Sequence, residues 1–169
     1  MTDNKNVSQF ELGWMAGIVD GEGCLYMTFK EASNFIGARV QVQACDYEMI
    51  KYFSDLLYLL QIKHVWKKRN TKQKNHHRNS YILDIQTKPT VLKFTRLFKD
   101  LLVVKKHQCV LMNEYLERAI KEKRYSPSER DKEIVQLVKS LKKNTIEELL
   151  ENPSIITKGQ SAAKLARNS

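Results

Sequence analysis

Residues 8–23 read SQFELGWMAGIVDGEG, and this stretch predicts a helix that passes directly into a strand. Ser8 and Glu11 have the spacing of a capping box, in which the serine oxygen accepts a backbone N–H and the glutamate side chain reaches back to the helix start. The helix is therefore expected to begin near Gln9. The glycines and acidic residues of DGEG then end the helix, and the sequence after them alternates between apolar and polar residues.

One face of this predicted helix carries almost no side-chain bulk. Gly13, Ala16, Gly17 and Asp20 recur at i, i+3, i+4 and i+7, a spacing that places them on one side. Glycine inside a helix costs about 1 kcal/mol relative to alanine, so two glycines on one face indicate a packing purpose. We expect a second backbone to approach this face closely. Taken alone, the stretch also fits an amphipathic core helix followed by a solvated glycine turn.

Residues 15–23, MAGIVDGEG, resemble the signature of the LAGLIDADG homing endonucleases, with Met for the leading Leu and Glu for the final Asp. In that family two such helices pack at a two-fold or pseudo-two-fold axis, and the last acidic residue of each motif holds a divalent metal over DNA. The resemblance implies that Glu22 binds Mg²⁺ with the Gly21 carbonyl as a second ligand. It also implies that Mn²⁺ or Ca²⁺ can substitute in binding.

The length and charge of the chain are consistent with this resemblance. Its 169 residues make one ordinary domain, and only one copy of the motif occurs. Because the family's chemistry needs two acidic centres, the resemblance implies a homodimer that joins through the small face of the helix. A net charge of +10 favours a polyanionic partner but does not distinguish DNA from RNA.

The cysteines and the apolar segments indicate where such a protein works. Three cysteines lie far apart with no metal-binding spacing, and an odd number makes a poor disulfide framework, so we expect reduced thiols. The N-terminus lacks the profile of a signal peptide, and no apolar run approaches the roughly 20 residues that span a membrane. We expect a soluble, intracellular protein with no membrane partner.

The rest of the chain predicts an α+β fold. Alternating strands over 24–30 and 38–45 form a hairpin, a helix over 47–60 covers it, and strands near 62–70 and 81–86 form a second hairpin. Helices from Pro89 and from Lys105 follow. The order is αββαββα with a trailing helix, and the resemblance implies that the antiparallel sheet forms a DNA-binding saddle. The domain prediction is a core over 8–120, accessory C-terminal helices over 126–152 and a flexible tail over 153–169.

A basic run lies between residues 61 and 80. It contains no acidic residue and seven basic ones: Lys63, Lys67, Lys68, Arg69, Lys72, Lys74 and Arg78. A solvated loop flank is the simplest explanation, but sustained charge of one sign beside an apolar-faced strand favours a phosphate-facing surface. The interleaved histidines His64, His76 and His77 are expected to contact phosphate or solvent rather than to catalyse.

The polar faces of the strands are the candidate base-reading surface. Arg39, Gln41 and Gln43 alternate along one strand and so project together, and arginine with guanine and glutamine with adenine are favoured major-groove pairs. Seven further residues are predicted to extend this surface: Tyr26, Thr28, Lys30, Trp66, Lys68, Asn70 and Asp84. Any solvent-facing sheet shows similar alternation, so the pattern alone does not decide the function.

Two further residues complete the predicted catalytic set. Asp46 stands at a strand-to-helix junction, where it fits an N-cap and where the family often carries a polar residue that positions water. Lys105, or alternatively Lys106, aligns with a lysine that the family keeps near the scissile phosphate. Ile50 occupies the position of an additional arginine found in some members. A bound metal can activate water itself, so no histidine base is required.

Together with these patterns, the resemblance implies a homodimeric, Mg²⁺-dependent endonuclease that cuts long palindromic or near-palindromic duplex DNA, with intron-encoded homing as the implied biology. A second hypothesis is a non-cleaving DNA-binding protein or an RNA maturase, with intron RNA as partner, on the same scaffold. Retention of both Asp20 and Glu22 argues against lost cleavage. A third hypothesis, a generic basic RNA-binding protein, lacks the aromatic signature of an RNA-recognition motif.

Overall fold

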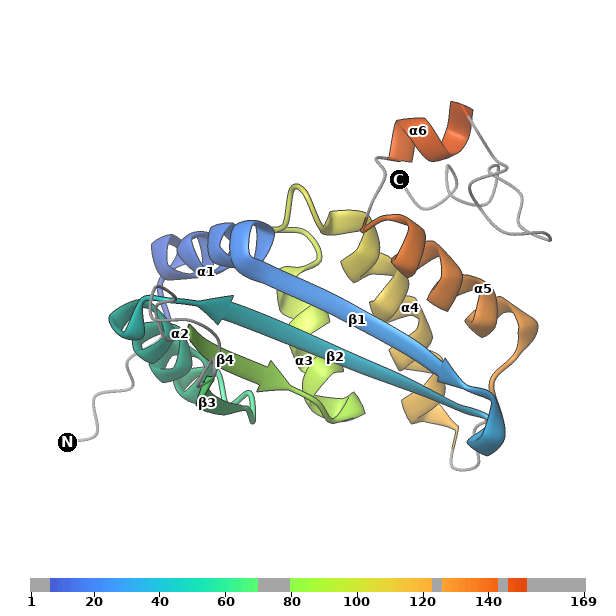
Figure 1. The fold of residues 1–169 in the computed structure, drawn as a ribbon, viewed down its shortest axis with the longest axis horizontal. Coiled ribbons are helices and arrows are strands. Elements are labelled where there is room, and N and C mark those ends of the chain that lie inside the picture. The colour runs from blue at the N-terminus through green and yellow to red at the C-terminus, as the bar shows by residue number, and fades with distance from the viewer. Residues whose placement is uncertain (1–6, 70–79, 123–125, 143–145, 152–169) are drawn as a thin grey trace, which may run out of the picture.

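The computed structural model of the chain describes residues 7–69, 80–122, 126–142 and 146–151. Its elements follow the predicted order (Figure 1) and are α1 Gln9–Glu22, β1 Gly23–Lys30, β2 Phe35–Ala44, α2 Tyr47–Leu59, β3 Val65–Arg69, β4 Ser80–Ile85, α3 Lys88–Phe98, α4 Lys106–Lys121, α5 Glu129–Ser140 and α6 Ile146–Glu151. A short 3₁₀ turn, Glu31–Ser33, connects β1 to β2. The predicted α+β class and αββαββα order are confirmed.

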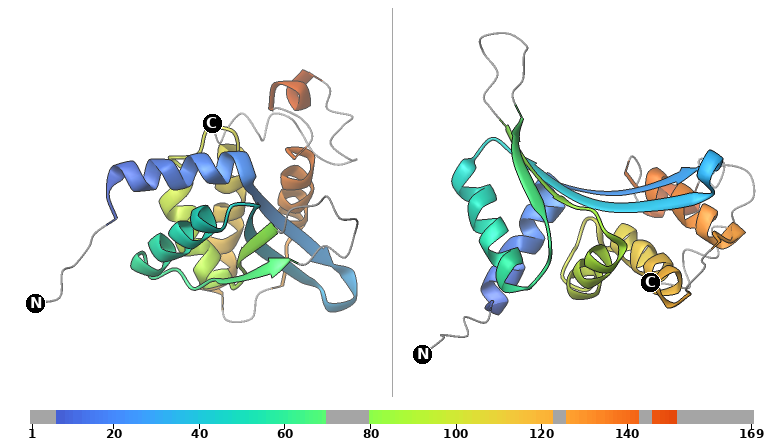
Figure 2. Two further views of the ribbon diagram at one scale, coloured as in Figure 1. Left: turned by 60° about the vertical axis from the view of Figure 1, so that its left-hand side comes forward. Right: turned by 90° about the horizontal axis from the view of Figure 1, so that it is seen from below.

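The four strands form one antiparallel sheet in the order β1-β2-β4-β3. The sheet is curved, and α1 to α5 lie on one side of it, so that its other face is left uncovered by helices (Figure 2). The apolar residues of the strands face the helices, as their alternation predicts. For example, Leu25 pairs with Val40 and Val42 pairs with Leu83, and all four side chains are buried.

Helix α1 begins at Gln9 and ends within DGEG, as predicted. The capping box is present: Glu11 N–H donates to Ser8 Oγ at 3.2 Å, and Ser8 N–H donates to the Glu11 carboxylate at 2.7 Å. The helix continues through Glu22, and the Gly23 N–H then bonds to the Val19 carbonyl. Because Gly23 is already the first residue of β1, no connecting loop separates helix from strand.

The C-terminal helix α5 shares the hydrophobic core with the rest of the fold. It packs against α4 and β1, and its Ile134, Val135, Leu137 and Val138 are buried in the same apolar cluster as the sheet. Burying an aliphatic side chain of this size contributes roughly 1.5–3 kcal/mol. The division at residue 120 stays a prediction, and the tail over 153–169 lies outside the described residues.

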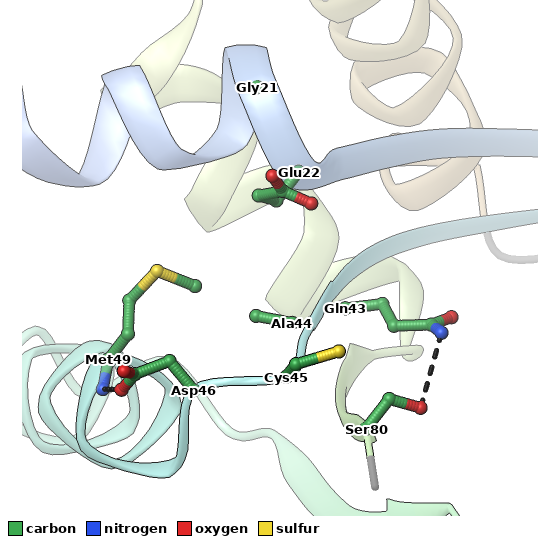
Figure 3. A pocket seen from close by; sticks show the side chains of 8 residues that line it. All are labelled: Gly21, Glu22, Gln43, Ala44, Cys45, Asp46, Met49 and Ser80. Carbon is green, nitrogen blue, oxygen red and sulfur yellow. Dashed lines mark hydrogen bonds between the residues drawn. The ribbon is translucent and has the colours of Figure 1, made fainter. Parts of the chain in front are cut away.

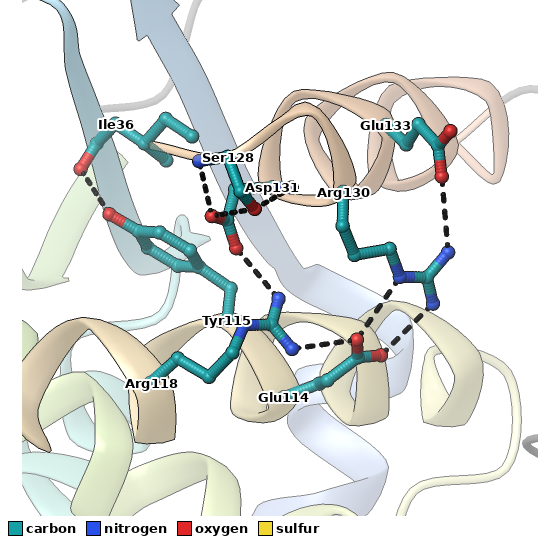
Figure 4. A network of polar contacts seen from close by, with 8 residues as sticks. All are labelled: Ile36, Glu114, Tyr115, Arg118, Ser128, Arg130, Asp131 and Glu133. Atoms are coloured by element: carbon teal, nitrogen blue, oxygen red, sulfur yellow. Dashed lines mark hydrogen bonds and ion pairs between the residues drawn. The ribbon is translucent and has the colours of Figure 1, made fainter. Parts of the chain in front are cut away.

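A network of polar contacts also joins α5 to the core (Figure 4). The buried Asp131 accepts from Arg118 Nη2 at 2.6 Å and completes a capping box with Ser128 at the start of α5. Glu114 of α4 contacts Arg118 at 2.9 Å and Arg130 at 3.1 Å. A buried carboxylate needs such partners because leaving its charge unpaired is strongly destabilising. The contacts therefore fix α5 in one position on α4.

The cysteines are free, as predicted. Cys109 is buried, and burial raises the pKa of its thiol to about 12, so this side chain stays protonated and unreactive near neutral pH. None of the helices within the described ranges is both long enough and apolar enough to cross a membrane.

Candidate functional site

The end of α1 forms one wall of an open cavity of about 590 Å³ (Figure 3). Three elements supply the other walls, and the lining residues are Gly21, Glu22, Gln43, Ala44, Cys45, Asp46, Met49 and Ser80. The sequence separates Glu22 from Asp46 by a complete hairpin, and the antiparallel return of β2 brings them to the same cavity. Three predicted site residues, Gly21, Glu22 and Asp46, therefore meet here.

The last turn of α1 offers oxygen atoms to this cavity. Glu22 is exposed, and Figure 3 shows its side chain directed away from the helix toward the end of β2. Gly21 belongs to the same turn, where backbone carbonyls have no N–H partner inside the helix. The negative end of the helix dipole adds attraction for a cation.

These donors fit a hard divalent cation. A carboxylate and a backbone carbonyl are oxygen ligands of the kind that Mg²⁺ takes while it retains several waters. Within the described residues of one chain, no group of three or more His, Cys, Asp or Glu side chains could hold a metal ion. The described residues of one chain therefore offer at this cavity one carboxylate and one backbone carbonyl that could serve as metal ligands.

Asp46 is the N-cap of α2, as its position predicts. Its Oδ1 accepts from the Met49 N–H at 2.8 Å, which satisfies one of the unpaired N–H groups at the helix start. The carboxylate remains exposed beside the cavity. The capping role leaves the second oxygen as the atom that can order a water molecule.

Lys105 contacts the last turn of α1 at Asp20. Its ammonium contacts the Asp20 carbonyl, and its backbone N–H donates to Asp20 Oδ1 at 2.9 Å. The Val103 N–H donates to the other oxygen of Asp20 at 2.8 Å. Lys105 is therefore held next to the last turn of α1, although it does not line the cavity with Glu22. The alternative, Lys106, is the first residue of α4.

The structure corrects the composition of the small face of α1. Gly13 and Gly17 are exposed, and a Cβ atom at either position would meet nothing within 4 Å. Ala16, in contrast, is buried in the core with 4% exposure. Asp20 does not offer a small surface, because its carboxylate binds the segment before α4.

Three apolar side chains beside the glycines were not among the predicted interface residues. Phe10 of α1 is 83% exposed, and Val103 and Val104 next to Asp20 are 81% and 74% exposed. Large apolar side chains left this open near a bare helix face are typical of an interaction surface. The LLVV run in the sequence was the available signal for the two valines, but hydrophobicity alone places such a run in the core.

The uncovered face of the sheet carries most of the predicted reading residues. The strand pairings place Tyr26 opposite Arg39 and Gln41 opposite Asp84, and Thr28, Lys30 and Gln43 continue the same face. A hydrogen bond with Cys24 and partial burial raise the pKa of Tyr26, and they outweigh the lowering effect of the Arg39 charge.

The pairing of β3 with β4 assigns the residues of β3 to faces of the sheet that differ from the predicted ones. Lys67 pairs with Ile82 and Arg69 with Ser80, which places these two basic side chains on the uncovered face. Trp66 and Lys68, predicted on that face, pair with Leu83 and Tyr81 and therefore point to the helix side. The ring of Trp66 packs on Tyr47 and Tyr81, with centroids 5.8 and 6.2 Å away.

The remaining residues of the basic run are only partly described. Asn70, Lys72, Lys74, His76, His77 and Arg78 lie outside the described residues. His64 bonds within the protein, since its ring nitrogens lie 2.6 Å from Ser54 Oγ and 2.8 Å from the Ile62 carbonyl. Both ring nitrogens of His64 are therefore engaged by protein atoms rather than available to DNA. Ile50, where some LAGLIDADG proteins carry arginine, is fully buried in the core.

No protein-family model matches the chain, and no curated protein matches it. Solved structures do match. The homing endonuclease I-CvuI in complex with its target and Ca²⁺ aligns with a TM-score of 0.54 at 15% identity, over 94% of this chain and 92% of that one. The meganuclease I-SmaMI bound to uncleaveable DNA aligns with a TM-score of 0.55 at 20% identity, over 95% of this chain but 49% of that one.

The LAGLIDADG meganuclease I-AabMI, bound to uncleaved DNA, gives a similar result. It aligns with a TM-score of 0.51 at 19% identity, over 91% of this chain and 48% of that one. The chain therefore has the LAGLIDADG homing-endonuclease fold. It corresponds to nearly all of I-CvuI and to about half of each longer meganuclease.

Proposed function

We propose that this chain, with the fold of the LAGLIDADG homing endonucleases, is a site-specific endonuclease that hydrolyses phosphodiester bonds in double-stranded DNA. The observation that carries the proposal is the cavity at the end of α1, which combines Glu22, the Gly21 carbonyl and Asp46. This cavity adjoins a curved sheet whose uncovered face presents arginine, lysine and glutamine side chains. Oxygen ligands beside a basic surface are what metal-assisted phosphodiester hydrolysis requires.

In this proposal Glu22 and the Gly21 carbonyl hold Mg²⁺. When bound, Mg²⁺ supplies positive charge to a phosphoryl oxygen and lowers the pKa of the attacking water. The free oxygen of Asp46 orients water in the cavity, while its Oδ1 stays on the Met49 N–H. The Lys105 ammonium rests on the Asp20 carbonyl and can move from there to the negative charge that develops on the phosphate.

The active protein in this proposal is a homodimer joined through the exposed glycines of α1. The chain aligns with about half of the longer meganucleases, which supports a single chain as half of a complete unit. A two-fold axis places one Glu22 from each copy near the centre of the complex. The same axis makes the target palindromic or nearly so, because each copy presents the same sheet to one half-site.

The test is cleavage of a pool of randomised duplex DNA with Mg²⁺, followed by sequencing of the ends. We expect Glu22→Gln to abolish cleavage while it leaves the fold, the oligomeric state and specific DNA binding intact, because the amide keeps the size of the side chain but loses the charge that holds the metal. Glu22→Asp keeps the charge and should retain measurable cleavage. Cleavage by Glu22→Gln at the unmodified rate would exclude the metal-binding role.

A further inference from the structure

Asp84 is a buried carboxylate on the uncovered face of the sheet. It is the only acidic residue among the described strand residues on that face, where it stands opposite Gln41 on β2 and Val65 on β3. Its side chain is 7% exposed. A carboxylate this deeply buried is stable only with close partners, so its contacts show what it does.

Asp84 contacts two neighbouring side chains through the same oxygen. Gln41 Nε2 donates to Asp84 Oδ1 at 2.9 Å, and Arg39 Nε lies 3.1 Å from that atom. The Arg39 Nε atom is itself buried and is not aligned for a hydrogen bond, so this contact is an ion pair. The Tyr26 hydroxyl donates to Gln41 Oε1 at 3.4 Å, and the Arg39 guanidinium lies 5.2 Å from the Tyr26 ring centroid.

These contacts determine which atoms the two side chains offer outward. Arg39 Nε lies against the buried carboxylate, while 41% of the arginine side chain remains exposed, so its guanidinium can meet a base from the uncovered face. Two parallel N–H groups match the O6 and N7 acceptors of guanine. The amide of Gln41 is fixed in one orientation, because its nitrogen donates to Asp84 and its oxygen accepts from Tyr26.

We propose that Asp84 sets base specificity without touching DNA, by holding Arg39 and Gln41 in the orientations that read two neighbouring base pairs of each half-site. The inference rests on the proposed function and adds a positioning residue to it. The carboxylate also offsets the Arg39 charge. Arg39 therefore contributes less to attraction for phosphate, which carries no sequence information, than an unpaired arginine would.

The test is site selection from a pool of randomised duplex DNA in Ca²⁺, with four proteins: unmodified, Asp84→Asn, Arg39→Ala and the double variant. Asparagine keeps the shape of the side chain and removes its charge. We expect Asp84→Asn to lose discrimination at the Arg39 position by roughly 5-fold to 150-fold, the range expected for one bidentate contact. Its binding to non-selected DNA should strengthen, since one acidic charge per chain is gone.

The double variant shows whether Asp84 acts through Arg39. If it does, Asp84→Asn causes no further loss at that position once Arg39 is alanine, so the two changes are not additive. Additive losses would overturn the inference and would indicate that Asp84 contacts the base itself. A selected sequence that is unchanged in Asp84→Asn would overturn it as well.

Ser80→Ala is the matched control on the same strand. Ser80 Oγ accepts from Gln43 Nε2 at 3.3 Å, so this change should shift preference at the Gln43 position and leave the Arg39 position unchanged. Loss of preference at both positions would show a general disturbance of the sheet and would count against the inference. If the unmodified protein selects no sequence, both the proposed function and this inference fail. If the unmodified protein selects a sequence and Asp84→Asn selects the same one, only the inference is refuted.

Discussion

Gly23 is the residue at which helix α1 becomes strand β1, and the fold requires it to lack a side chain. A Cβ atom built at Gly23 would lie 2.4 Å from the Val19 carbonyl oxygen and 2.8 Å from the Val19 Cα. Both are backbone atoms of the last turn of α1, so they cannot turn aside as a side chain can. The final glycine of the motif is therefore a packing residue as well as a helix terminator.

We predict that Gly23→Ala lowers the free energy of unfolding by about 1–3 kcal/mol, the usual range for forcing an extra carbon into a packed site. Gly21→Ala is the control, because a Cβ there meets nothing within 4 Å. Alanine inside a helix should raise the stability by up to about 1 kcal/mol. Urea titration measures both values, and equal stability of the two variants would contradict the steric argument.

The residues of α1 also show which features of a helix can be predicted from residue spacing in the sequence. Spacing predicts the capping box and the shared exposed side of Gly13 and Gly17, because both depend only on the angle between residues on one helix. It does not place Ala16 or Asp20, since their surroundings come from distant segments. Asp20 binds N–H groups more than eighty residues away, at Val103 and Lys105, and no local pattern indicates such contacts.

Among the elements, the strands differ in how well their sequences predict which face each side chain occupies. The β1 and β2 strands alternate between apolar and polar residues, and this alternation predicts the face to which each side chain points. All five residues of β3 are exposed, so burial imposes no apolar period on them. Only pairing with β4 sets its phase, and for this reason the predicted face of Trp66 and Lys68 is wrong.

At the level of α1 we predict that Gly17→Leu weakens the proposed homodimer before it unfolds the chain. The open space over Gly17 accommodates the leucine in a single chain but not between two helices in contact. Sedimentation over a dilution series should show a lower mass for this variant. Gln136→Leu, an exposed position on α5, is the control for added apolar bulk. A Gly17→Leu protein that sediments and cleaves like the original would refute this interface.

The ion pairs between α4 and α5 predict that the fold loses stability at acidic pH. Burial raises the pKa of Glu114, but the guanidinium groups of Arg130 and Arg118 outweigh this effect and hold the pKa below its ordinary value of 4.5. A group whose pKa is lowered in the folded state stabilises the fold above its unfolded pKa and loses that contribution as the pH falls. Stability should therefore decline as the pH drops below about 4.5.

Glu114→Gln tests this explanation. The variant should be less stable than the original at neutral pH, and the difference should shrink as the pH falls through the range where Glu114 becomes protonated. Thermal unfolding followed at several pH values gives the comparison. Parallel pH curves for the two proteins would show that other carboxylates cause the acid sensitivity.

For the whole molecule, the surplus of positive charge is relevant to DNA binding where it lies on the uncovered face of the sheet. The chain carries 29 Lys and Arg against 19 Asp and Glu. Lys67 and Arg69 project from that side, on the strand that forms one edge of the sheet. Their place at an edge suits contact with a phosphate backbone, and Arg39 and Gln41 lie nearer the middle, on β2.

We predict that replacing both Lys67 and Arg69 with alanine weakens binding to all duplex sequences alike. The slope of log affinity against log salt should fall by up to about 0.9 for each phosphate that the variant no longer neutralises. Replacing Lys99 and Lys121, which belong to the helix layer, removes the same charge and should leave the slope nearly unchanged. A change in the preferred sequence of the Lys67/Arg69 variant would show that these residues read bases.

The direct passage from α1 into β1 has a mechanical consequence. With no loop between them, the helix of about 21 Å and the strand of about 27 Å behave as the two arms of one rigid lever with Gly23 at its bend. If the two elements move as one body, a small rotation of α1 at the exposed glycines would produce its largest displacement at the tip of the β1–β2 hairpin. If two chains meet through α1 as proposed, substitutions that alter this contact would also change the distance between the two half-sites, so dimer geometry and target spacing would have to evolve together.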